Sequence, residues 1–181
     1  MRKQFFNHEP RVFAHRGVSH EYPENTMISF KKAVEIGADV IETDVHFTRD
    51  RRFAVIHDET LTRLTDGAGK ISDYTMDELK RFDAGHRFTP DGETFPFRGK
   101  GLTIPSLDEL LSEFPEQRFN IDLKDKNPAQ AGPYCELITR HNAAHRVLTA
   151  SEHRANLAAV RRLLPEMATS ASMWEAVWIF F

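Results

Sequence analysis

Three carboxylates occupy positions from which they could hold a metal ion. Glu42 and Asp44 lie two residues apart in the run DVIETDVHF (39–47), and Asp122 lies in the run RFNIDLK (118–124). Side chains two residues apart on a β-strand point to the same face. Clustered carboxylates repel one another unless a cation or a proton neutralises them, and oxygen ligands suit hard divalent ions. We therefore expect Glu42, Asp44 and Asp122 to bind Mg²⁺ or Ca²⁺.

Two histidines and two basic residues extend this set towards phosphoryl-transfer chemistry. Arg16 and Lys124 carry fixed positive charges that, together with a metal ion, would clamp a phosphate and the additional charge of its transition state. His15 and His57 are imidazoles with an ordinary pKa of about 6.5, which suits an acid and a base at neutral pH. The sequence does not indicate which histidine is the acid.

All of these residues lie in or directly after predicted β-strands. The predicted strands cover residues 11–15, 39–47, 53–57, 118–124, 145–150 and 167–171. Helical patterns follow most of them, and this alternation favours parallel strands joined by crossover helices. The carboxyl ends of parallel strands meet on one side of the sheet, where such folds bind ligands. We therefore expect the charged residues to converge there.

Capping patterns predict where the helices begin. Asn25 is expected to cap a helix over 26–36, and Ser151 a helix that ends before Pro165. Capping-box spacings begin two further helices, at Thr75 with Glu78 and at Ser106 with Glu109. The remaining predicted helices cover 127–141 and the start of one over 174–181. Residues 60–103, rich in glycine and proline, are expected to form a small insertion or long loop after the third strand of a single domain covering 1–181.

The composition excludes several classes of protein. The chain has 181 residues, with 24 Lys and Arg against 27 Asp and Glu, and this near-neutral balance argues against a nucleic-acid binder. A single cysteine, Cys135, excludes an internal disulfide and a Cys-based zinc site. Residues 1–10 show no secretory signal, and no apolar run approaches the ~20 residues of a membrane helix. We expect a cytoplasmic protein without a membrane span.

Six motifs together resemble the glycerophosphodiester phosphodiesterase family. They are HRG (15–17), PENT (23–26), ETD (42–44), HDETLTRLTDG (57–67), IPSLDELL (104–111) and NIDLK (120–124). Each motif alone is weak, but the ordered set at these intervals is specific. The match is close over about residues 11 to 125 and loose beyond.

The resemblance implies a fold, a reaction and a role for each residue. It implies a TIM-type (β/α) barrel and metal-dependent hydrolysis of glycerophosphodiesters to sn-glycerol 3-phosphate and an alcohol. By position, Glu42, Asp44 and Asp122 match the metal ligands, His15 and His57 the acid/base pair, and Arg16 and Lys124 the phosphate-contacting cations. The third ligand in the family is more often Glu, so Asp122 departs from the pattern and its shorter side chain could change the metal distance.

Length is the larger departure from the family. A complete eight-stranded barrel typically needs ~250 residues, whereas these 181 residues offer about six strands. We expect an incomplete barrel that lacks its C-terminal part, as in a truncated product or a fragment. Two open strand edges would remain, through which copies of the chain could self-associate.

Several alternatives stay open at this stage. The substrate could instead be a lysophospholipid or another lipid diester, cleaved at the same site in a phospholipase D-like reaction. The chain could also be an inactive barrel that acts only as a binding or interaction module. Among single residues, Glu42 and Asp44 could belong to the solvated face of an edge strand. His46 is expected either beside the site or facing solvent, not as a ligand, and Asp58 is expected to bond loop amides.

Overall fold

The computed structural model describes residues 3–7, 10–172 and 175. Its strands are β1 (Phe13–His15), β2 (Val40–Phe47), β3 (Phe53–Val55), β4 (Arg118–Leu123), β5 (Val147–Ala150) and β6 (Ala168–Thr169). Its α-helices are α1 (Met27–Glu35), α2 (Met76–Leu79), α3 (Leu107–Glu113), α4 (Ala131–Arg140) and α5 (Arg154–Leu163), and three 3-10 helices cover Gln4–Phe6, Ile71–Asp73 and Pro128–Gln130. The helix expected over 174–181 lies, apart from residue 175, outside the described residues.

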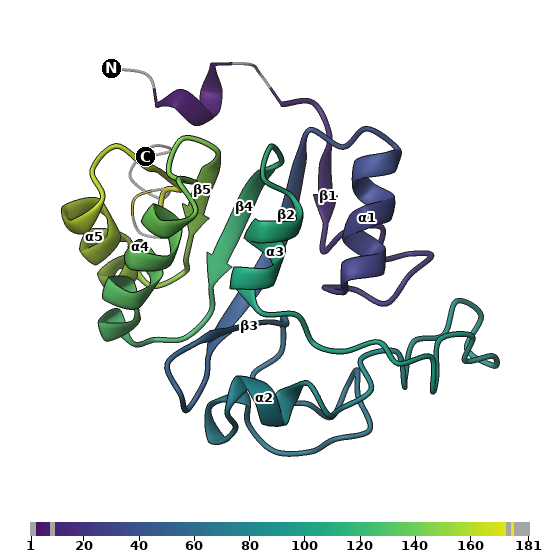
Figure 1. The fold of residues 1–181 in the computed structure, drawn as a ribbon. Helices are drawn as coiled ribbons and strands as arrows, with labels where there is room; N and C mark the ends of the chain where they lie inside the picture. The colour runs from purple at the N-terminus through teal and green to yellow at the C-terminus, as the bar shows by residue number, and fades with distance from the viewer. Residues whose placement is uncertain (1–2, 8–9, 173–174, 176–181) are drawn as a thin grey trace.

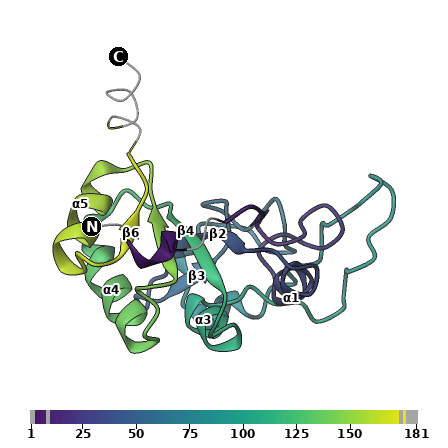
Figure 2. The ribbon, with the colours of Figure 1, turned by 90° about the horizontal axis from the view of Figure 1, so that it is seen from above.

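The strands form one six-stranded sheet with helices on its outer face. Five strands run parallel in the order β1-β2-β4-β5-β6, and β3 pairs with β2. Figures 1 and 2 show α1, α3, α4 and α5 on the same side of this sheet. This is the architecture of an incomplete TIM-type barrel, as expected from the sequence. No helix among the described residues is long and apolar enough to cross a membrane.

Strand β3 does not run parallel to its neighbour, and the expectation that it does is wrong. Val55 pairs with Val45 and Phe53 with Phe47 in an antiparallel register. Only residues 48–52 connect the two strands. That length suffices for a hairpin, whereas a parallel crossover needs a dozen residues or more. The hairpin returns the chain along β2, so that the N–H of Ile56 donates to the carbonyl of Asp44 at 3.0 Å. His57 therefore reaches the predicted site from the opposite direction.

The predicted alternation of side chains along the central strands is confirmed. Ile41 and Val45 on β2, and Ile121 and Leu123 on β4, are fully buried in the core shared with the helices. The intervening positions face the inside of the barrel and carry most of the polar residues. At the amino ends of the strands this inner face becomes apolar, because Phe5 packs there against Val40 and Ala168.

Local capping chemistry agrees with the sequence at two helices and differs at two others. Both capping boxes form, at Thr75 before α2 and at Ser106 before α3. The cap of α1 is Thr26 rather than Asn25, and the cap of α5 is His153 rather than Ser151. In both exceptions the expected cap makes tertiary hydrogen bonds instead, described below.

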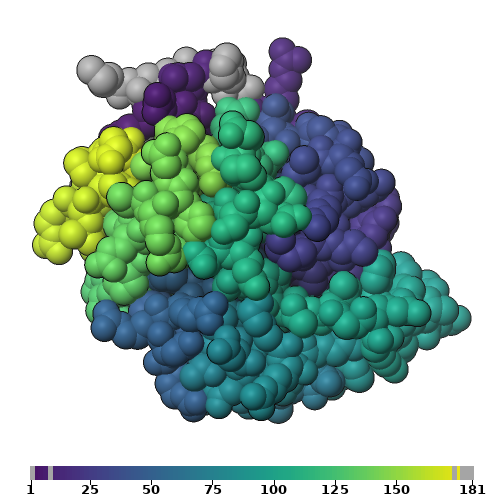
Figure 3. Space-filling view, viewed as in Figure 1, coloured from purple at the N-terminus to yellow at the C-terminus, as the bar shows by residue number. Residues whose placement is uncertain are grey.

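Residues 60–103 form a lobe with a small core of its own. Leu61, Ile71, Met76 and Leu79 are buried in one cluster with Ala54 of β3 and with Ile56, which follows β3. Figure 3 shows this lobe, in blue and teal, projecting from the rest of the molecule. This region contains two short helices, Ile71–Asp73 and α2, and α2 begins at the predicted capping box of Thr75.

Candidate active site

The register of the central strands brings the predicted carboxylates together. In the parallel pairing of β2 with β4, Asp44 lies beside Asp122 and Glu42 beside Asn120. On the other side of β2, Glu42 pairs with His15 of β1. These residues face the inside of the barrel near the carboxyl ends of the strands, so the expected convergence occurs although the residues lie far apart in the chain.

Lys124 lies between two of these carboxylates. Its Nζ is 3.0 Å from Asp44 Oδ1 and 2.8 Å from Asp122 Oδ2. Burial opposes the charge on Lys124, but the hydrogen bonds to the two carboxylates and their negative charges outweigh burial and raise its pKa. Lys124 is therefore a positive charge that bridges Asp44 of β2 and Asp122 of β4.

Arg16, the residue directly after β1, also approaches Asp44. Its Nε lies 3.2 Å from Asp44 Oδ2, and its Nη1 lies 3.0 Å from Glu24 Oε1. Arg16 and Gly17 both have positive φ, at 56° and 84°. A Cβ added at Gly17 would lie 2.3 Å from the Oγ of Ser29, so the tight turn that aims Arg16 depends on glycine.

Asn25 orients Asp44 through a side-chain hydrogen bond, a role that the sequence alone did not indicate. Asn25 is 2% exposed and adopts a φ of 56°. Its Nδ2 donates to Asp44 Oδ2 at 3.1 Å, and its Oδ1 accepts from the hydroxyl of Thr43 at 2.8 Å. The helix-cap assignment failed because these tertiary partners compete for the amide. The positive φ that asparagine tolerates leaves no signal in a single sequence.

The chemistry of the donor set fits a divalent cation. Burial, followed by the nearby charge of Asp44, raises the pKa of Glu42 to about 7. Asp122 Oδ1 and Asn120 Oδ1 are buried and accept no hydrogen bond from the described residues. Oxygen atoms that are buried and short of donors are the ligands that Mg²⁺ and Ca²⁺ use.

The side-chain positions, however, do not form a closed metal site. Across residues 3–7, 10–172 and 175, no three Asp, Glu, His or Cys side chains are grouped closely enough to hold an ion. Lys124 explains this, because its ammonium group occupies the space between Asp44 and Asp122. Binding of an ion by Glu42, Asp44 and Asp122 thus requires side-chain movement and stays a prediction.

His57 is oriented by a carboxylate that itself is held by an arginine. His57 Nδ1 lies 2.8 Å from Asp58 Oδ1, and Arg63 Nε donates to Asp58 Oδ2 at 2.6 Å. The hydrogen bond from Arg63 comes first among the causes that lower the pKa of Asp58 to about 2. Because the ionised Asp58 only accepts, His57 Nδ1 carries a proton and Nε2 is left for proton transfer. Among the described residues, the partners of the Asp58 carboxylate are the side chains of His57 and Arg63, not the loop amides expected.

His15 lies at the edge of the site and is much more accessible. Its side chain is 65% exposed, and its Nε2 is 3.9 Å from Glu42 Oε2. Phe13, two residues earlier on the same face of β1, is 45% exposed. Among the described residues, β1 pairs only with β2, so its other edge is an open edge of the sheet.

His46 lies beside the site and links three segments. It is 5% exposed; its Nδ1 is 2.8 Å from Asp125 Oδ1, and its Nε2 is 3.0 Å from the carbonyl oxygen of His57. The other oxygen of Asp125 accepts from the N–H of Phe47 at 2.6 Å. His46 thus joins the end of β2 to the segment after β4 and to the backbone of His57, in agreement with the expectation that it lies beside the site.

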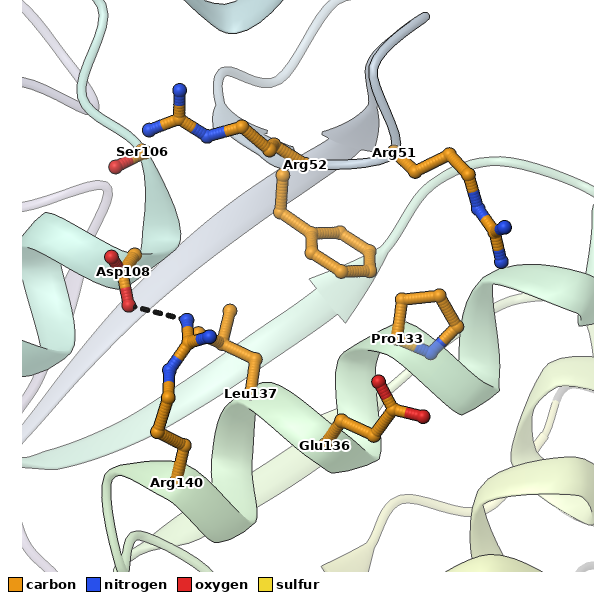
Figure 4. A pocket seen from close by; sticks show the side chains of 9 residues that line it. Arg51, Arg52, Ser106, Asp108, Pro133, Glu136, Leu137 and Arg140 are labelled. Atoms are coloured by element: carbon orange, nitrogen blue, oxygen red, sulfur yellow. Dashed lines mark hydrogen bonds and ion pairs between the residues drawn. The ribbon is translucent and has the colours of Figure 1, made fainter.

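A cavity of about 210 Å³ opens next to these residues. It is lined by His46, His57, Asp122, Leu123, Lys124 and Glu152. Glu152 follows β5 and was not recognised in the sequence, because no pattern marks which loop residues after a strand turn inwards. A second cavity, of about 200 Å³, lies on the helix side between the β2–β3 hairpin and α4. Figure 4 shows that one of its arginines, Arg140, pairs with Asp108 within the same pocket, at 2.8 Å.

Comparison with known proteins identifies relatives over most of the chain. A glycerophosphodiester phosphodiesterase of Bacillus altitudinis is 43% identical over 164 residues, which cover 87% of this chain and 64% of the relative. Human lysophospholipase D is 38% identical over 132 residues, which cover 73% of this chain and 42% of the relative. The chain thus spans less than two thirds of the length of these relatives.

Solved structures and a family model agree with these relatives. A phosphodiesterase of Oleispira antarctica, solved in complex with the product sn-glycerol-3-phosphate, superposes with a TM-score of 0.77 at 29% identity. The superposition covers 94% of this chain and 71% of that one. The model of the glycerophosphoryl diester phosphodiesterase family matches residues 15–174. By sequence and by fold, the chain belongs to the glycerophosphoryl diester phosphodiesterase family.

Proposed function

We propose that the chain carries the reaction centre of a metal-dependent phosphodiesterase that cleaves glycerophosphodiesters to sn-glycerol 3-phosphate and an alcohol. The observation that carries the proposal is the register of β2 with β4, which sets Asp44 beside Asp122 with Lys124 bonded to both. Family membership supports the reaction class.

In this proposal the basic residues bind the phosphate. Arg16 and Lys124 approach Asp44 from opposite neighbouring strands, so their positive charges flank one point on the inner face of the sheet. Arg16 donates a hydrogen bond to Glu24 and Lys124 one to Asp122, both in partly buried places, where such bonds are stronger than in water. They would stabilise the additional negative charge of the transition state on the phosphate oxygens.

Glu42, Asp44 and Asp122 would hold the divalent cation, Mg²⁺ or Ca²⁺. When bound there, the cation would polarise a phosphate oxygen as a Lewis acid. The raised pKa of Glu42 and the buried Oδ1 of Asp122, which accepts no hydrogen bond from the described residues, support this assignment, because both offer an oxygen atom to a cation. Lys124 would give up its position between the two aspartates and turn towards the phosphate.

The histidines would transfer the protons. His57, whose Nδ1 is held by Asp58, lines the same cavity as Lys124, and its Nε2 would exchange the proton. His15 approaches from the side of Glu42. One imidazole would remove a proton from the nucleophile, water or a substrate hydroxyl, and the other would protonate the departing alkoxide.

Release of sn-glycerol 3-phosphate from glycerophosphocholine tests the proposal. With Mg²⁺ or Ca²⁺ we expect turnover that EDTA abolishes. His15→Ala and His57→Ala should each lower kcat by about 10²- to 10⁴-fold, the usual contribution of general acid–base catalysis. His145→Ala, an exposed histidine at the opposite end of the sheet before β5, is the matched control and should retain wild-type activity. Turnover without metal, or full activity of either site variant, would refute the mechanism.

A second substrate class is favoured by the similarity to human lysophospholipase D. The same groups could cleave a lysophospholipid, because the bond and the charges at phosphorus are the same. Hydrolysis of lysophosphatidylcholine, compared with glycerophosphocholine under identical conditions, separates the two. Loss of both activities, with a broad melting transition and self-association in size-exclusion chromatography, would instead support an inactive binding module.

A further inference from the structure

The cavity beside His57 is bounded on its β5 side by a carboxylate that the proposed reaction does not use. Glu152 lines this cavity together with His57, Asp122 and Lys124. It is exposed and has no hydrogen bond or ion pair with any residue that the structure describes. Its charge is therefore available to a ligand in the cavity.

The backbone around Glu152 is held on both sides. Ser151 Oγ donates to the carbonyl of Leu123 at 2.7 Å and accepts from the N–H of His153 at 3.2 Å. The Nδ2 of Asn156 donates to the same Oγ at 3.1 Å and to the carbonyl of Asp125 at 2.8 Å. These bonds anchor the turn after β5 to the end of β4. Glu152 thus projects from a fixed turn beside the site.

The two basic residues of the proposed phosphate site are already paired with other carboxylates. Lys124, the cation lining the same cavity, is already shared by Asp44 and Asp122. Arg16 pairs with Asp44 and Glu24. When Lys124 and Arg16 bind a phosphate, the negative charge of Glu152 would therefore remain on one side of that phosphate. This charge attracts a cationic substituent of the substrate and disfavours an anionic one.

We propose that Glu152 selects glycerophosphodiesters whose alcohol carries an ammonium group, such as choline or ethanolamine, and that this group occupies the cavity lined by Glu152 and His57. This inference rests on the proposed function and names its substrate class. In this orientation the departing oxygen lies on the His57 side of the phosphate. Because Glu152 is exposed, its attraction is screened by water and salt, so the preference is of a few-fold rather than absolute.

The test compares two substrates of equal reactivity and different charge. The ratio of kcat/KM for glycerophosphocholine to that for the uncharged-alcohol diester glycerophosphoglycerol is measured for the wild type, Glu152→Gln and Glu152→Lys. We expect the ratio to fall about two- to fivefold in E152Q and further in E152K, mainly through KM. Adding 0.5 M NaCl, roughly a 4 Å Debye length, should reduce the wild-type preference. Glu116→Gln, an equal charge change at the amino end of β4, should leave the ratio unchanged.

The outcomes separate this inference from the proposed function. An unchanged ratio in E152Q, or an equal loss for both substrates, overturns the role of Glu152. If the wild type hydrolyses neither diester, the proposed function fails. Calorimetric binding of glycerophosphocholine to the wild type and to E152Q then decides the inference alone: weaker binding by E152Q supports it, and equal affinities overturn it.

Discussion

Replacing Asn25 by alanine tests whether a buried amide holds the central carboxylate. Asn25 is almost fully buried at a φ of 56° and makes two side-chain hydrogen bonds, to Asp44 and Thr43. A hydrogen bond to a charged group contributes about 2 kcal/mol and one between neutral groups about 1 kcal/mol. Placing alanine in the left-handed region costs about 1 kcal/mol more. We expect Asn25→Ala to lower the free energy of unfolding by about 4 kcal/mol.

Asn142 provides a matched control for the backbone contribution. It has a φ of 48°, is exposed and makes no side-chain hydrogen bond with the residues that the structure describes. Asn142→Ala should therefore lose only the backbone contribution, about 1 kcal/mol. The difference of about 3 kcal/mol between the two variants isolates the bonds of Asn25.

Urea unfolding followed by far-ultraviolet circular dichroism measures both variants in EDTA, so that metal binding does not contribute. Equal destabilisation by Asn25→Ala and Asn142→Ala would refute the reasoning, because it would mean that the hydrogen bonds to Asp44 and Thr43 contribute nothing net. A reduced urea dependence in N25A alone would indicate that the variant has left two-state behaviour.

Three further outcomes can be measured in the same way. Burial opposes the charge of His46, but the hydrogen bond that its Nδ1 donates to Asp125, together with the negative charge of Asp125, outweighs burial and raises the pKa of His46. The stabilisation is complete below about pH 6.5 and is lost as pH rises through the folded pKa, so the difference in unfolding free energy between wild type and His46→Gln should shrink towards alkaline pH. A pH-independent difference would contradict this. Burial and the charge of Asp44 raise the pKa of Glu42 from 4.5 to about 7, so the protein loses stability as pH rises through that interval. Glu42→Gln should therefore stabilise the protein by about 1–3 kcal/mol at pH 8 in EDTA. Ca²⁺ or Mg²⁺ should raise the melting temperature of the wild type but not that of E42Q. Finally, Phe5→Ala should lower the free energy of unfolding by about 3 kcal/mol, because Phe5 is buried against Val40 and Ala168. Replacing Phe95, which is 38% exposed, by alanine should cost much less; a loss in Phe5→Ala as small as that in Phe95→Ala would show that the segment carrying Phe5 does not dock.

Much of the framework follows from local sequence patterns. The alternation of Glu42 and Asp44 with Ile41 and Val45 correctly predicts which face of β2 is polar, because successive side chains of a strand point to opposite faces. The capping boxes at Thr75 and Ser106 correctly predict two helix starts, because their bonds join residues three apart.

Features that depend on long-range partners could not be predicted in this way. Asn25 and Ser151 have the residue types of helix caps, but Asp44 and Leu123, 19 and 28 residues away, take their hydrogen bonds. The direction of β3 is an intermediate case. The five residues between Phe47 and Phe53 already favour a hairpin, and strand–helix alternation elsewhere led to the wrong expectation.

The sequence by itself determined which chemical groups are present, on which strands and on which strand face, because these properties depend on residue type and a period of two. Only the tertiary structure decided how those groups meet. The register of β2 with β4 places Asp44 beside Asp122. Packing across the strands then places Lys124 between these two aspartates, Asp58 against His57, and Glu152 beside the cavity. Distances between side chains on different strands depend on the pairing of distant segments, which no local pattern encodes.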